Sequence, residues 1–145
     1  MTEIAFHFNA PDKLAYVCRL LRKAVGSGAR VVVTAAPPLL DGLDSALWSI
    51  TPQDFIAHCR AADSDAVMLR ASPVVLAESA DAQLPEAGVL VNLGAGVPEG
   101  FSRFGRLIEV VGRGEADRQQ ARQRWRHYAE RGYHIVRHDL VLKPA

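Results

Sequence analysis

Hydrophobic residues along the chain recur with two different spacings, and these spacings predict its secondary structure. Ile4, Phe6 and Phe8 alternate with other residues, which is typical of a strand over 3–9. From 14 to 24 the apolar positions follow helical spacing, with Asp12 before them as a cap. The rest of the chain predicts strands over 30–34, 66–69, 73–76, 88–93, 107–111 and from 133, helices over 39–48, 52–60 and 115–131, and a helical turn at 101–104.

Strands that alternate with helices predict an α/β protein, because neighbouring parallel strands are joined by crossovers that are usually helical. The run at 30–34 is apolar on both of its faces, as in the buried sheet of such a fold. No linker, repeat or low-complexity segment interrupts the pattern. We therefore expect a single domain over 1–145 with a mostly parallel central sheet.

The composition excludes several classes of protein. Of the 145 residues 49% are hydrophobic, which is enough for a proper core and too many for a disordered chain. The only two cysteines, Cys18 and Cys59, are too few and too far apart for a disulfide scaffold. No apolar run approaches the ~18 residues of a membrane span, and the first residues lack a signal-peptide pattern. We therefore expect a cytoplasmic protein with no membrane contact.

Charge is nearly balanced in total but unevenly distributed. Seventeen Lys and Arg residues stand against sixteen Asp and Glu residues, a net charge of +1. Residues 61–100 hold one basic residue against six acidic ones, whereas residues 101–145 hold ten against five. The near-zero total argues against a protein that mainly binds bare DNA. The basic end still permits a small site for an acidic partner.

The motifs of common enzymes are absent, so no catalytic residue, metal or cofactor is expected. The loop at 94–100 follows a predicted strand and is rich in glycine, but Pro98 removes a backbone donor and Glu99 repels anions. A nucleotide-binding enzyme built on this loop remains a minor alternative. His134 and His138 lie on a predicted strand about 13 Å apart, which is too far for a shared metal ion.

The predicted helix at 115–131 carries the candidate chemistry. At 100° per residue, Arg118, Arg122 and Arg126 form one row beside an apolar stripe that includes Trp125. Arginine forms forked contacts with carboxylates and phosphates. Such a face suits single-stranded nucleic acid, or an acidic peptide that ends in a hydrophobic residue with a free carboxylate. It is also compatible with a plain amphipathic helix whose arginines are solvated.

A second candidate surface lies around Trp48 and Phe55. These large aromatic residues flank a segment that contains Pro52. They are either ordinary core residues or a patch that binds a partner protein, since such residues are enriched in interface hot spots.

These features together resemble the chi subunit family of bacterial DNA polymerase III, the accessory subunits of the clamp-loader complex. The resemblance covers almost the whole chain and includes the runs FHF, LLRKAVGSGARVVV, VLVNLG, FSRFGRLIEVV and ARQRWRHYAERGYHI. Its most specific part is LDSALWSITPQDFIAH, where the matching positions are Leu43, Asp44, Leu47, Trp48, Pro52, Phe55 and His58.

The resemblance implies a Rossmann-like, three-layer fold without a functional nucleotide-binding loop. It also implies a non-catalytic subunit that acts in DNA replication at the cytoplasmic replisome, with little or no direct DNA binding. One surface would bind the psi subunit, and through it the clamp loader. Another would bind the acidic C-terminal tail of single-stranded DNA-binding protein (SSB). By position, the tail-binding residues would be Val111, Arg118, Arg122, Trp125 and Arg126, and the psi-binding residues Trp48 and Phe55. The alternative is a direct single-stranded nucleic-acid-binding protein that uses the same arginine and tryptophan face.

Overall fold

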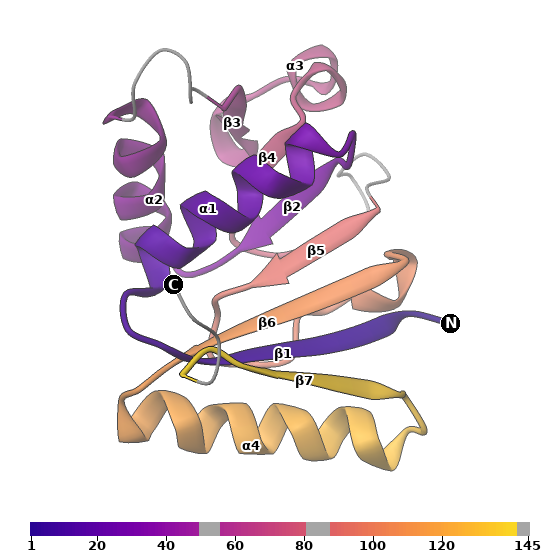
Figure 1. Cartoon of the computed structure of the whole chain (residues 1–145). Coiled ribbons are helices and arrows are strands. Elements are labelled where there is room, and N and C mark those ends of the chain that lie inside the picture. The colour runs from indigo at the N-terminus through magenta and orange to yellow at the C-terminus, as the bar shows by residue number, and fades with distance from the viewer. Residues whose placement is uncertain (50–55, 81–87, 142–145) are drawn as a thin grey trace.

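A computed structural model describes residues 1–49, 56–80 and 88–141. In these ranges seven strands form one sheet in the order β3-β4-β2-β5-β6-β1-β7, and every neighbouring pair is parallel (Figure 1). The strands are β1 Glu3–Ala10, β2 Val31–Thr34, β3 His58–Arg60, β4 Val74–Ala77, β5 Val89–Asn92, β6 Arg106–Gly112 and β7 Ile135–Asp139. The prediction of a mostly parallel α/β sheet is confirmed.

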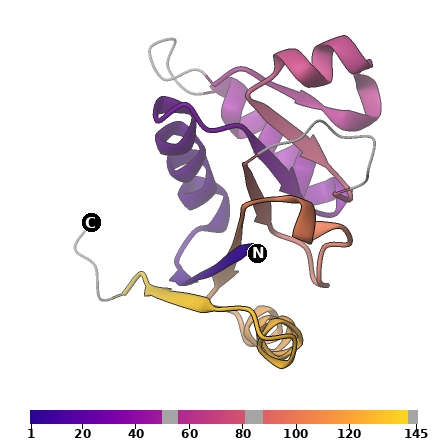
Figure 2. The same ribbon diagram turned by 90° about the vertical axis from the view of Figure 1, so that its right-hand side faces the viewer.

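Helices cover both faces of this sheet, so the architecture has three layers. The helices are α1 Lys13–Gly26, α2 Pro37–Ser49, α3 Ala66–Ala71 and α4 Glu115–Glu130, and the short 3-10 turns are η2 Ala61–Asp63 and η3 Phe101–Arg103. Alternate β2 side chains divide the core: Val31 and Val33 pack with α1 and α2, whereas Val32 packs in the cluster that includes α4. Figure 2 shows α1 and η3 on opposite sides of the sheet. This is the expected Rossmann-like arrangement.

Local sequence signals position α4 along β6, β1 and β7 (Figure 1). Glu115 and Asp117 lie in its first turn, where negative charge complements the helix dipole. The Asp117 carboxylate also accepts a 2.7 Å hydrogen bond from the backbone N–H of Gly112 and pairs with Lys13 Nζ at 3.2 Å. Gly132, with φ of 80°, allows the turn into β7. Both ends of α4 are therefore fixed relative to β6 and β7.

Two sequence predictions of secondary structure are wrong. The apolar run at 66–69, expected as a strand, forms α3, because the Asp65 carboxylate caps it by accepting from the Met68 N–H at 2.8 Å. The helix expected at 52–60 is wrong at its C-terminal end, because residues 58–60 form strand β3 and pair with β4. Its positions 52–55 lie outside the described residues. Both segments are short, so apolar spacing could not distinguish helix from strand.

Candidate peptide-binding site

A pocket of about 450 Å³ opens between α4 and the outer strands of the sheet. Its residues come from four elements, β1, β6, α4 and β7, and are Phe6, Phe8, Val111, Arg118, Ala121, Arg122, Trp125, Arg126 and Arg137. All five residues predicted for tail binding are among them. The structure thus brings this set together.

Aromatic and aliphatic side chains form the apolar part of the pocket. Phe6 and Val111 are each 3% exposed and belong to the core on the α4 side of the sheet. The Trp125 ring is half-buried and packs on Phe6, with 5.0 Å between ring centroids. The core residues Phe6 and Val111, with Trp125 packed on Phe6, therefore give a hydrophobic side chain of a ligand a preformed surface to pack against.

The charged part of the pocket is entirely basic. Arg118, Arg122 and Arg126 are exposed along α4, and none of the described residues that line the pocket is acidic. Arg122 lies 3.6 Å from the Glu115 carboxylate, but both side chains are more than half exposed, so this ion pair is weak. The arginines can therefore give up bound water, or the contact with Glu115, and bind an incoming carboxylate at little cost in free energy.

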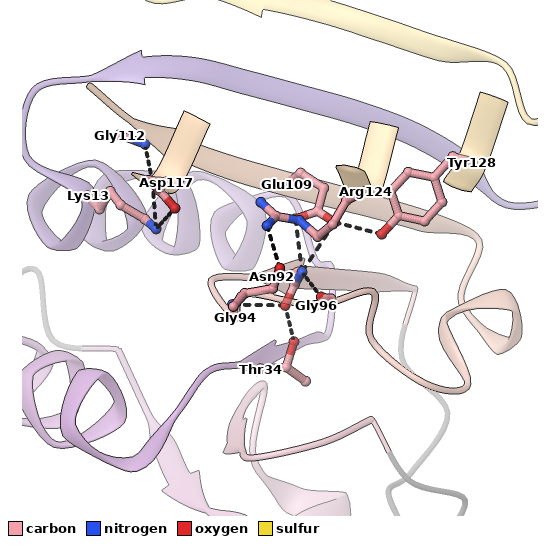
Figure 3. A network of polar contacts seen from close by, with 11 residues as sticks. Lys13, Thr34, Asn92, Gly94, Gly96, Glu109, Gly112, Asp117, Arg124 and Tyr128 are labelled. Carbon is pink, nitrogen blue, oxygen red and sulfur yellow. Dashed lines mark hydrogen bonds and ion pairs between the residues drawn. The ribbon is translucent and has the colours of Figure 1, made fainter. Parts of the chain in front are cut away.

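A fourth arginine of α4, Arg124, points inward and not into the pocket. Its Nε donates to the Glu109 carboxylate at 3.0 Å, and its Nη1 donates to the Ala95 carbonyl at 2.8 Å. The Tyr128 hydroxyl and the Asn92 side-chain amide also donate to Glu109, at 2.6 and 2.9 Å (Figure 3). We call Asn92, Glu109, Arg124 and Tyr128 the buried network. Arg124 is only 2% exposed.

The electrostatics of the buried network follow from its burial. Burial raises the pKa of Glu109, and the adjacent Arg124 guanidinium opposes that rise. Burial and the neighbouring carboxylate raise the pKa of Tyr128, so its hydroxyl keeps the proton that it donates. Every partner that faces Glu109 is a donor, which is the arrangement a buried charge requires. The network joins α4 to β5, β6 and the loop after β5.

Sequence reasoning missed the buried network, although one signal could have found it. On the helical projection Arg124 lies within about 40° of Tyr128, on the sheet-facing side of α4. Glu109 interrupts an otherwise apolar strand, and a buried charge of this kind needs a partner.

Sequence reasoning also missed Arg137 and Phe8. The Arg137 guanidinium lies 5.8 Å from the Trp125 ring centroid and 5.5 Å from that of Phe8. The predicted strand from 133 includes both His134 and His138 and therefore position 137, but the face on which Arg137 lies was not considered. Its alternation places Arg137 on the same face as Ile135, towards α4.

The second predicted surface is described only in part. Trp48 lies at the end of α2, is 63% exposed, and packs against the His58 ring with 5.3 Å between centroids. His58 Nε2 in turn contacts Asp44 Oδ1 at 2.8 Å, which joins α2 to β3. Phe55 lies outside the described residues. Trp48 is therefore a surface residue beside the β3 edge of the sheet, not part of the core.

The glycine-rich loop after β5 is held by protein contacts. The Asn92 side chain accepts from the Gly94 N–H at 3.0 Å and donates to the Gly96 carbonyl at 3.1 Å. The residues that line a pocket beside the loop include Glu78 and Glu99, whose carboxylates suit a phosphate poorly. Within 1–49, 56–80 and 88–141 there is no cluster of three potential metal ligands, and no helix is long and apolar enough to cross a membrane.

Comparison with known proteins establishes the family. The chain is 33% identical over 145 residues to the DNA polymerase III subunit chi of Pseudomonas aeruginosa, covering 97% of this chain and 98% of that protein. A chain in a solved complex of Saccharomyces cerevisiae Dbp5 with Nup159, Gle1, IP6 and ADP is similar in fold alone, with a TM-score of 0.63, 11% identity, and coverage of 96% of this chain and 42% of that one. The family model for the DNA polymerase III chi subunit, HolC, matches residues 1–136. The chain therefore belongs to the chi subunit family of DNA polymerase III.

Proposed function

We propose that this chain, as one domain, is a non-catalytic accessory subunit that tethers the clamp loader to DNA coated with SSB. The α4 pocket captures the acidic C-terminal tail of SSB, and the surface around Trp48 and Phe55 binds psi. Family membership supports a role in DNA replication at the cytoplasmic replisome. The observation that carries the tail proposal is a pocket with apolar residues and several arginines, in which no carboxylate lines the described part.

The geometry matches the chemistry of such a tail. Arg118 to Arg126 spans eight residues of helix, or about 12 Å. An extended peptide covers the same length with about four residues. Acidic side chains along the tail can therefore meet successive arginines while the terminal hydrophobic side chain packs near Trp125 and Val111. Because the arginines are exposed, binding should weaken as salt is added.

Charge reversal at the centre of the arginine row tests this proposal. Arg122→Glu replaces an attractive contact by a repulsive one, so we expect it to lower the affinity for a synthetic tail peptide by about a hundredfold or more. Isothermal titration calorimetry measures the loss. The matched control is Arg106→Glu, the same charge change at the exposed start of β6, at the other end of the strand from Val111. Equal affinity of the two variants would refute the tail assignment.

The same protein separates the tail proposal from direct nucleic-acid binding. The aromatic residues that line the pocket, Phe6, Phe8 and Trp125, are buried or half-buried, whereas proteins that bind single strands stack successive bases on exposed rings. We therefore expect no appreciable anisotropy change with a bare oligonucleotide at moderate salt. Tight binding with a steep salt dependence, lost in Arg122→Glu, would instead support the nucleic-acid alternative.

A further inference from the structure

Arg137 gives the pocket a basic group on the wall opposite the arginine row. Arg137 lines the pocket from strand β7 of the sheet, and its Cα is paired in register with that of Phe6 in β1. The three pocket arginines of α4 approach from the helix. A ligand seated between helix and sheet would therefore meet guanidinium groups from both sides.

The position of Arg137 is also fixed more closely than that of an ordinary exposed arginine. Its guanidinium lies against two aromatic rings, Phe8 and Trp125, at 5.5 and 5.8 Å from their centroids. Such stacking holds the planar group in place and leaves its N–H edge available to a carboxylate. A group held in advance loses less entropy on binding than a solvated side chain.

We propose that Arg137 is a specificity-determining residue of the pocket, which binds the carboxylate nearest the hydrophobic end of the peptide. The proposal rests on the proposed function. The aromatic rings that hold Arg137 are the same apolar surface that a terminal hydrophobic side chain would contact. The nearest carboxylate is either the terminal α-carboxylate or an acidic side chain a residue or two before it, and both have the same chemistry. Carboxylates further from the hydrophobic end of the tail bind the arginine row of α4.

Arg137→Met tests the inference because methionine keeps an apolar stem beside the two rings and loses the charge. The matched control is Arg106→Met. The probe is a short synthetic peptide with several aspartates that ends in phenylalanine with a free carboxylate, titrated by calorimetry. We expect Arg137→Met to bind it about tenfold more weakly than the control does. Arg137→Lys, which keeps charge but loses the planar fork, should fall between them.

Modified peptides identify the carboxylate that Arg137 binds. One peptide carries a terminal amide, a second has its last aspartate replaced by asparagine, and a third has its first aspartate replaced instead. The effect of Arg137→Met should disappear with the first peptide if the terminal carboxylate is bound, or with the second if a side chain is bound. It should persist with the third.

Two results would overturn the inference. One is Arg137→Met binding the parent peptide as tightly as Arg106→Met does, and the other is a loss that stays the same with all three modified peptides. If Arg122→Glu still weakens binding as predicted in that case, the proposed function stands and the role of Arg137 alone is wrong. If the unmodified protein binds no acidic peptide, both proposals are wrong.

Discussion

At the scale of single residues, the buried network and the pocket divide the arginines of α4 into two kinds. Arg124 is buried and bonded, whereas Arg118, Arg122 and Arg126 are exposed beside the pocket. Helical projection and the family resemblance together predicted the pocket arginines. Residues four apart on a helix lie in one row, and this spacing does not depend on how the helix packs against the sheet. Neither predicted the role of Arg124, because that role depends on its pairing with Glu109, a residue of another element.

Removing Arg124 should destabilise the protein strongly and in a pH-dependent way. Arg124→Met leaves the Glu109 carboxylate buried without its cation, which costs about 3–5 kcal/mol when that carboxylate is charged. In the variant the pKa of Glu109 rises further above its ordinary value of 4.5, because burial is then unopposed by a cation. The destabilisation should therefore be small below that ordinary value and grow as pH rises through the raised one. Urea unfolding at acidic and neutral pH measures this trend.

A double variant provides the control for the buried network. Glu109→Gln with Arg124→Met removes the charge together with its partner, so it should be more stable at neutral pH than Arg124→Met alone. A double variant that is less stable at neutral pH, or a cost of Arg124→Met that does not change with pH, would contradict the ion-pair account.

At the scale of elements, the glycine-rich connection between β5 and β6 has a structural role. Its loop carbonyl at Ala95 accepts from Arg124, and Gly100 starts η3 with φ of 81°. The sequence predicted a strand, then a loop, then a helical turn here, and all three are present. It could not predict α3 or β3, because a run of three to six residues has no periodicity that separates helix from strand.

A side chain at Gly100 should destabilise the protein. A Cβ there would lie 2.7 Å from the Ala80 carbonyl oxygen, and the positive φ adds strain, so we expect Gly100→Ala to cost about 1–3 kcal/mol of unfolding free energy. Gly96→Ala in the same loop is the matched control, since nothing lies within 4 Å of its Cβ position. That change should stay within about 0.5 kcal/mol of the parent in thermal or urea unfolding. Equal costs at both positions would show that the close approach at Gly100 is unimportant.

At the scale of the whole molecule, the two proposed binding surfaces lie at opposite edges of the sheet. Trp48 packs on His58 of β3, and Arg137 belongs to β7. Seven strands separate these edges by about 29 Å at 4.8 Å per strand, so one partner need not displace the other. The alternation of strands and helices predicted a parallel sheet. It could not predict the strand order β3-β4-β2-β5-β6-β1-β7, which depends on long-range packing, and this order brings α4 to the edge opposite Trp48.

The α4 pocket is proposed to capture the end of the SSB tail. The most direct measurement is a calorimetric titration of the protein with intact SSB and with SSB that lacks its acidic C-terminal tail. We expect binding to the intact protein that weakens with salt, and no measurable binding to the truncated one. Equal binding of the two forms would contradict the account, because it would place the contact outside the tail.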